Sequence, residues 1–271
     1  MYSGFIKKRK RIERFKILFL SFCLGALLIL AVYTANILPY LYYLFYNGIY
    51  GIILSIIIPL IILYRNKENL QSVGFKSLYL RQWIILIGFV VFSISGRIIP
   101  LALKGTKIQW ELIQICFFPL IMTTFFEEFL IRGFLQTRIE KQFGFFVAIF
   151  VSGFIFSIYH IGYPGYRNID SLLLLFIVGI GFATAFKLSG NNLYIAYFVN
   201  LPNAFVTYIL NSAQFPMLTI KAIINAIITI ILIIVILTIF NKIGGLQNLR
   251  RKFFKNARKN SSFSVLLFKI I

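Results

Sequence analysis

Long apolar runs, interrupted by short polar segments, cover most of the chain. Many approach the ~20 residues that a helix needs to cross the hydrocarbon core of a bilayer. The runs predict eight membrane-spanning helices, at about residues 16–38, 48–64, 82–103, 109–137, 143–161, 169–188, 191–211 and 217–241. The helix breakers Pro39, Gly105, Pro164 and Pro216 fall in the connections, where turns are expected. The pattern therefore predicts an all-α, polytopic membrane protein.

The composition excludes an ordinary soluble domain. Of the 271 residues, 60% are hydrophobic and 13% are charged, whereas a soluble domain carries about 25% charged residues. No soluble segment is long enough to fold alone, so we expect a single integral membrane domain over residues 1–271. The run 16–38 is too long for a signal peptide and no small-residue cleavage site is evident, which favours a retained first span.

Basic residues gather in the connections between the apolar runs. The chain has 28 Lys and Arg against 7 Asp and Glu, a net charge of +21. The main basic clusters lie at residues 7–11, 65–81, 138–141 and 242–259. Flanking clusters of this kind mark cytoplasmic loops, with Lys104 and Lys107 as minor exceptions, so both termini are expected in the cytoplasm. Nucleic-acid binding is the weaker interpretation of the charge.

The basic tail, residues 246–271, carries interspersed Phe and Leu. We expect it to lie on the anionic inner leaflet of the bilayer, with disorder as the alternative. The abundance of Ile, Lys, Asn, Phe and Tyr in the whole chain is typical of a low-GC bacterial genome. A cell membrane of a bacterium is therefore the expected location.

Two adjacent carboxylates and a guanidinium stand out inside the fourth apolar run. Glu127 and Glu128 account for two of only seven acidic residues, and Arg132 follows four positions after Glu128. On a helix Glu128 and Arg132 are i,i+4 neighbours in the favourable order for an ion pair. Glu127 is rotated from Glu128 by about 100° and is left without that counter-ion. Because ionisable groups at membrane depth are expensive, the default interpretation is a functional site.

The only histidine of the chain, His160, ends the fifth apolar run. It shares a helix face with Phe156, one turn earlier. Its imidazole can exchange a proton near neutral pH, and the carboxylates precede it by one helical hairpin. The alternative is a histidine that simply sits at the outer interface. A turn near Glu140 would leave Glu127 and His160 about 10 Å apart in depth on straight helices, so a tilt, a break or an extension must bring them together.

A third polar cluster, Asn200 and Asn203 around Pro202, lies in the seventh run. Pro202 removes a backbone hydrogen bond, and such breaks are tolerated at membrane depth mainly where they face protein or a wet cavity. The amides could donate hydrogen bonds to a developing oxyanion. From this cluster alone, hydrogen bonds that join helices are the stronger interpretation.

These polar residues together suit the attack of an activated water on a carbonyl, with a base, an imidazole and amide donors. A serine mechanism lacks a GxSxG motif. A zinc site lacks HExxH, and a single imidazole is fewer nitrogen ligands than zinc usually has. Cys23 and Cys116 lie far apart without CxxC spacing, which supports neither a disulfide nor a thiolate site. No metal or other cofactor is expected.

The motifs resemble a known family. Glu127-Glu128-Phe129-Leu130-Ile131-Arg132 matches the EExxxR motif of the CPBP family, also called Abi, of CAAX proteases and bacteriocin-processing enzymes. The run from Phe156 to His160 matches its FxxxH motif, and Ser72-Val73-Gly74-Phe75 is similar to the usual lead-in to its third span. Residues 189–203 resemble the segment that leads into its last motif, HxxxN. The resemblance covers about residues 70–210.

The resemblance implies an eight-helix intramembrane endopeptidase with a central cavity that reaches the cytoplasm. In this family Glu127 would activate the water, Glu128 and Arg132 would maintain the shape and charge of the site, and His160 would assist. The family's final histidine falls on Asn200, which cannot carry a proton but can serve as an oxyanion donor. The family asparagine falls on Ala204, with Asn203 one position earlier.

The expected function is therefore a metal-independent glutamic endopeptidase that cleaves a peptide or a membrane protein near the cytoplasmic face. The family context adds bacteriocin processing or self-immunity as its role. Two alternatives remain from other classes. One is a catalytically inactive immunity or scaffold protein that binds a partner through the same groove. The other is a small proton-coupled transporter, which the lack of a visible repeat between the two halves disfavours.

Overall fold

The computed structural model describes residues 2–105 and 110–210, with scattered positions between 224 and 242, and all regular secondary structure in this part of the chain is helical. The elements are α1 (Tyr2–Ile37), η1 (Pro39–Leu41), η2 (Tyr43–Ile57), α2 (Ile58–Arg65), η3 (Leu70–Val73), α3 (Leu80–Leu103), α4 (Leu112–Glu127), η4 (Glu128–Gln136), α5 (Thr137–Phe143), α6 (Phe145–Tyr159), η5 (His160–Gly162), η6 (Pro164–Tyr166), α7 (Ile169–Leu188) and α8 (Leu193–Leu210). The all-α prediction is confirmed for these residues.

Among the residues that the structure describes, four helical segments are long and apolar enough to cross a membrane: Ile12–Ile37, Tyr43–Arg65, Phe145–Gly162 and Ile169–Leu188. They correspond to the first, second, fifth and sixth predicted spans. Shorter apolar helices occupy parts of the third and seventh, at Leu80–Gly96 and Leu193–Pro202. The apolar helices indicate a multi-pass membrane protein. The eighth predicted span and the basic tail fall mostly outside the described residues.

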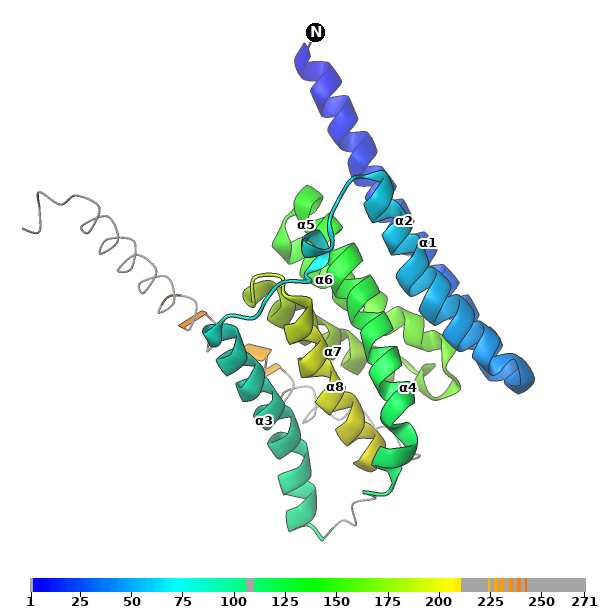
Figure 1. The fold of residues 1–271 in the computed structure, drawn as a ribbon, viewed down its shortest axis with the longest axis vertical. Helices are drawn as coiled ribbons and strands as arrows, with labels where there is room; N and C mark the ends of the chain where they lie inside the picture. Colours follow the sequence, from blue (N-terminus) through cyan, green and yellow to red (C-terminus); the bar gives the residue numbers. More distant parts are fainter. Residues whose placement is uncertain are drawn as a thin grey trace, which may run out of the picture.

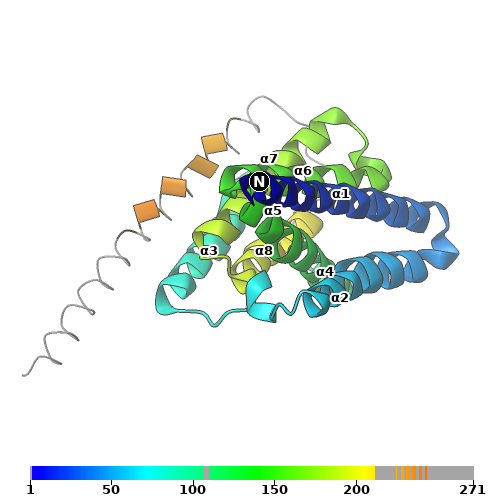
Figure 2. The same ribbon diagram turned by 90° about the horizontal axis from the view of Figure 1, so that it is seen from above.

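The helices form a bundle with the α4–η4–α5 path inside it (Figure 1). α4 packs against α8 and η2, α6 packs against α7 and α1, and α3 packs against α8. Seen from above, α1 and α2 lie along one flank and α3 along another (Figure 2). Every residue of η4 is buried, so the segment that carries Glu128 and Arg132 belongs to the core of the described bundle. η4 has the wider π-helical turn, a rare local structure that often occurs at functional sites.

The turn between the fourth and fifth predicted spans lies at Gly144, not near Glu140 as the sequence suggested. Helix α5 continues through Glu140 to Phe143, and Gly144 then adopts a φ of +85°, a conformation that glycine reaches without steric cost. Glu127 lies 17 residues before Gly144 and His160 lies 16 residues after it. The expected offset in depth therefore disappears, because the two arms of the hairpin are almost equally long.

Residues 66–79, which connect α2 to α3 and are called the strap below, cross the end of η4. A Cβ added to Gly133 would lie 2.7 Å from the carbonyl oxygen of Val73, so only glycine allows this close approach. The backbone N–H of Leu193 donates to the Gly74 carbonyl at 2.8 Å. The strap thus fastens η4 to the first turn of α8, which carries Asn200 further along.

Gly133→Ala is expected to destabilise the protein by about 1–3 kcal/mol, as other overpacked positions do. The strap backbone would have to move, because the clash is with a main-chain oxygen. The matched control is Gly88→Ala in α3, where an added Cβ meets nothing within 4 Å. That variant should be unchanged or stabilised by up to about 1 kcal/mol, because alanine favours a helix over glycine. Thermal unfolding in detergent compares the two variants, and equal midpoints would contradict the close approach.

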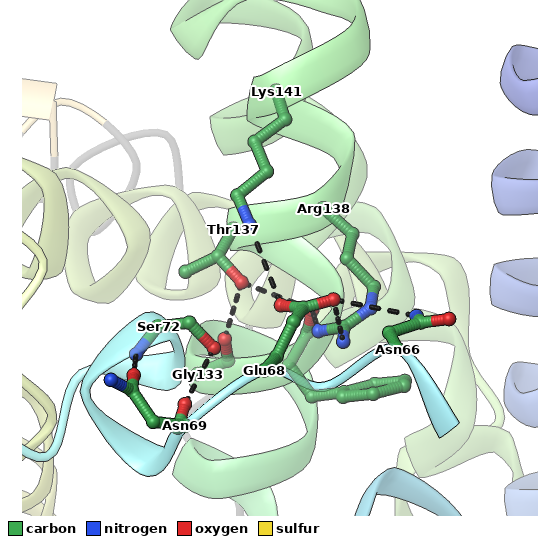
Figure 3. Close-up of polar contacts among 9 residues, drawn as sticks. Asn66, Glu68, Asn69, Ser72, Gly133, Thr137, Arg138 and Lys141 are labelled. Carbon is green, nitrogen blue, oxygen red and sulfur yellow. Dashed lines mark hydrogen bonds and ion pairs between the residues drawn. The ribbon is translucent and has the colours of Figure 1, made fainter. Parts of the chain in front are cut away.

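Glu68 ties the strap to α5 through two cations (Figure 3). Its carboxylate accepts from Arg138 at 3.1 Å and lies 3.5 Å from the Lys141 ammonium. Burial alone would raise the pKa of Glu68, but Arg138 and Lys141, with hydrogen bonds from Ser72 and Asn66, outweigh it and lower the pKa below its usual value. The charged form of Glu68 therefore holds this end of the bundle together.

Acidification is expected to weaken this link. A carboxyl group whose pKa is lower in the folded state stabilises the fold above its unfolded pKa of about 4.3, and that contribution is lost as the pH falls through the folded value. Between about pH 6 and about pH 3, wild type should lose more stability than Glu68→Gln, which has no charge to lose. Unfolding midpoints against pH measure the difference. Glu13→Gln, which removes an exposed pair with Lys16, is the control, and parallel curves for wild type and Glu68→Gln would contradict the prediction.

Candidate active site

The Glu127 carboxylate lies at the junction of α4 and η4 and is held by two neutral donors. The Tyr159 hydroxyl at the end of α6 donates to Oε1. The Asn200 side-chain amide on α8 donates to Oε2 at 3.2 Å. Within the described residues, Glu127 forms no ion pair. The carboxylate is thus fixed from two other helices without being neutralised by a cation.

The Glu128 carboxylate, directly next in the chain, has a cationic partner. Its Oε2 lies 3.5 Å from Nε of Arg132, with both side chains fully buried, so the i,i+4 pair expected from the sequence is present. The Arg132 guanidinium also lies 4.5 Å from the ring centroid of Phe156 and donates to the Gly179 carbonyl at 3.5 Å. Three elements, η4, α6 and α7, therefore surround one buried positive charge.

Asn200 joins the two carboxylates. Its Nδ2 donates to Glu127 at 3.2 Å and to Glu128 at 2.9 Å, so both amide hydrogens point to carboxylates. Asn200 thus joins α8 to α4 and η4 by hydrogen bonds, the kind of contact that the sequence favoured for this amide. Pro202 lies inside α8 as expected, whereas the side chain of Asn203 lies outside the residues that the structure describes.

His160 is buried at the start of η5, and its contact with Glu127 is indirect. Its Nδ1 lies 2.6 Å from the Phe156 carbonyl oxygen. A carbonyl can only accept, so Nδ1 carries the hydrogen and Nε2 is the basic nitrogen of the neutral ring. The imidazole ring lies 4.1 Å from the Tyr159 ring and 5.0 Å from the Phe156 ring, between centroids. The structure therefore gathers Glu127, Glu128, Arg132, His160 and Asn200, with Tyr159 in contact with both Glu127 and the imidazole.

Tyr159 is the residue that the sequence reasoning missed. It belongs to a set of tyrosines that contains Tyr46 and Tyr163, whose hydroxyls lie 2.7 Å apart. The available signal was its position directly before His160: one residue along a helix turns the side chain by about 100°, so a neighbour of the histidine could face α4. Aromatic residues make up 18% of the chain, so the residue type alone did not distinguish Tyr159 from the others.

The described His, Cys, Asp and Glu side chains form no cluster typical of a metal centre. In the ranges 2–105 and 110–210 and the scattered positions beyond, no three His, Cys, Asp or Glu side chains gather closely enough to hold an ion. Cys23 lies in α1 as a free cysteine, far in sequence from the carboxylates. The chemistry on offer is that of a carboxylate base, an imidazole and neutral hydrogen-bond donors in an apolar bundle.

The apolar helices, the buried Glu128 and the partly buried Glu127 define a multi-pass membrane protein with a carboxylate site inside its helical bundle. Comparison with protein families is more specific: residues 109–201 match the family described as type II CAAX prenyl endopeptidase Rce1-like. This segment is a domain of that family, which confirms the CPBP/Abi assignment expected from its motifs. Comparison with curated proteins and with solved structures gave no match. The matched segment runs from before α4 into α8 and contains all five gathered residues.

Proposed function

We propose that this protein is an intramembrane glutamic endopeptidase in which Glu127 activates a water molecule. The observation that carries the proposal is that the two adjacent glutamates have different partners. Glu128 is paired with Arg132 at 3.5 Å, whereas among the described residues Glu127 is held by the neutral groups of Tyr159 and Asn200 and by no cation. A carboxylate without a cation is the better proton acceptor, and a general base must be free to accept.

The reaction begins when Glu127 takes a proton from water and the resulting hydroxide adds to the carbonyl carbon of the scissile peptide bond. The tetrahedral intermediate then collapses, the C–N bond breaks, and the proton passes to the leaving amine. His160 supports the transfer, since its Nε2 is the ring atom able to accept or pass a proton. Hydrolysis yields one carboxylate and one amine, and no covalent enzyme intermediate is needed.

Arg132 and Asn200 support the base electrostatically. Two neighbouring carboxylates repel each other, and the Arg132 guanidinium compensates the one that does not react. Asn200 holds both carboxylates in the resting arrangement. To stabilise the oxyanion, one of its amide hydrogens would exchange a carboxylate for the substrate oxygen, which is a small rotation for a side chain already at the site.

The proposed substrate is a peptide or a membrane protein that reaches the site from the cytoplasmic side, with both termini of the enzyme in the cytoplasm. Basic residues of the strap and α5, among them Arg138 and Lys141, lie at the Gly144 end of the bundle, which supports that end as the cytoplasmic one. Bacteriocin processing or self-immunity is the role that the family context favours.

The test uses the purified full chain in liposomes with three synthetic peptides. Two end in a cysteine, two aliphatic residues and a serine, one of them farnesylated on the cysteine, and the third is an apolar peptide without that ending. Mass spectrometry identifies the products. Support requires a defined cleavage that EDTA leaves intact and that Glu127→Gln lacks. Cleavage that EDTA abolishes would contradict the metal-independent mechanism. No product from any peptide would favour the non-catalytic scaffold.

A further inference from the structure

Each oxygen of the Glu127 carboxylate receives a hydrogen bond from a different helix. Oε2 accepts from Asn200 on α8, and Oε1 accepts from the Tyr159 hydroxyl at the end of α6. The terminal torsion of a glutamate is broad, with no strongly preferred value. Two external donors are therefore what fixes the plane of this carboxylate, and Tyr159 supplies one of them.

The ring of Tyr159 is itself immobilised by aromatic neighbours. It is fully buried, stacks on Tyr50 with centroids 6.0 Å apart and planes within 19°, and meets Phe156 edge to face at 6.0 Å. Tyr50 in turn packs edge to face on Phe126, the residue before Glu127. The hydroxyl and its acceptor are thus held by one continuous aromatic cluster.

A glycine in η2 makes this cluster possible. A Cβ added to Gly51 would lie 2.2 Å from the ring of Phe126, so Phe126 occupies the space that any side chain at position 51 would fill. Aromatic packing of this kind preorganises a polar group without requiring a conformational search. Tyr159 is therefore placed before substrate arrives.

We infer that Tyr159 is a positioning residue that orients the Glu127 carboxylate toward the attacking water. The inference rests on the proposed function and deepens it, since Tyr159 occupies an unspecified position of the FxxxH motif, to which the resemblance assigns no role. A neutral hydroxyl suits the task because it fixes the carboxylate without the full positive charge that would hold back a proton acceptor. Tyr159 acts through Glu127 and makes no contact with the substrate in this role.

Tyr159→Phe keeps the ring and removes only the hydroxyl. We expect kcat for the peptide that wild type cleaves to fall about 10- to 100-fold, the range for losing one hydrogen bond to a charged group. KM should stay within about twofold, because the hydroxyl contacts the base and not the substrate. 4-Aminophenylalanine at position 159 restores a donor at the same place and should recover most of the lost rate.

The matched control is Tyr163→Phe. It removes a partly buried hydroxyl from the same cluster, one that hydrogen-bonds to Tyr46 and not to Glu127. It should keep kcat within about twofold of wild type. Its unfolding midpoint should fall no further than that of Tyr159→Phe, because it loses a hydrogen bond between two neutral groups.

The outcomes separate the inference from the proposed function. If Glu127→Gln is inactive and Tyr159→Phe is as fast as wild type, the inference is overturned while the proposed function stands. If Glu127→Gln cleaves like wild type, both fall. An equal loss of kcat in Tyr159→Phe and Tyr163→Phe, or a loss in Tyr159→Phe that 4-aminophenylalanine does not recover, would reduce Tyr159 to a structural residue and overturn the inference. If Tyr159→Phe does not fold, the 4-aminophenylalanine variant alone decides. A wild-type kcat in that variant would support the inference that a donor is needed at position 159. A folded but inactive variant would overturn the inference.

Discussion

Glu127→Gln is expected to lower kcat about 10²- to 10⁴-fold, the usual contribution of a positioned general base. Glutamine has nearly the same shape as glutamate but cannot take a proton from water at neutral pH. The loss should appear in kcat, with peptide binding retained, since no substrate contact is removed.

The fold should tolerate this change because its hydrogen bonds can rearrange. The glutamine oxygen can accept from Asn200, and its NH2 group can donate to Tyr159, whose hydroxyl serves as donor or acceptor. Size-exclusion behaviour and the unfolding midpoint in detergent should therefore match wild type. Glu13→Gln makes the same chemical change at an exposed position of α1 and should retain full activity.

A Glu127→Gln protein that cleaves at the wild-type rate would remove the catalytic role of this residue. A protein that protects cells from a bacteriocin equally well with or without the Glu127 carboxylate would instead support the scaffold alternative. Proton-coupled flux in liposomes that requires Glu127, with no cleavage product, would favour the transporter.

Arg132→Met is expected to have the largest effect on stability, about 3–5 kcal/mol, the range for breaking a buried ion pair by removing one partner. The variant would leave the fully buried Glu128 carboxylate without its cation. Arg132→Lys should recover only part of this loss. Lysine places a compact ammonium where the planar guanidinium reaches Glu128, the Gly179 carbonyl and the Phe156 ring together.

A double-mutant cycle isolates the pair. Glu128→Gln with Arg132→Met should be less destabilised than the sum of the single variants, because the double variant no longer buries an unpaired charge. Chemical unfolding in detergent micelles measures all four proteins. Arg65→Met, at the exposed end of α2, should cost at most about 1 kcal/mol as the control. An Arg132→Met protein no less stable than Arg65→Met would show that the pair carries no stability.

Local patterns in the sequence were enough for part of the structure. Apolar runs predicted the four described helices that are long and apolar enough to cross a membrane, because hydrophobic length is a property of a single segment. The Glu128–Arg132 pair was also predictable, since i,i+4 neighbours meet on any helix. The family motifs located the segment that carries the site, and the comparison at residues 109–201 agrees with it.

Features that depend on two segments were not predictable in the same way. The role of Tyr159 depends on how α6 is rotated relative to α4, and that rotation is set by packing around Phe126 and Gly51. The hydrogen bonds from Asn200 to both glutamates depend on the position of α8 along its own axis. The strap fixes that position through the hydrogen bond between Leu193 and Gly74. The turn at Gly144 was missed because Glu140 and its basic neighbours resembled a loop, although they form a helical turn.

The hairpin around Gly144 has a consequence for changes in chain length. Its arms of 17 and 16 residues bring Glu127 and His160 to about the same level. A single-residue insertion in one arm would shift that side by about 1.5 Å and rotate it by about 100°, carrying Glu127 or Tyr159 out of register. Grafts between this chain and another protein should therefore exchange the whole hairpin, from the start of α4 to the end of η5, as one indivisible cassette.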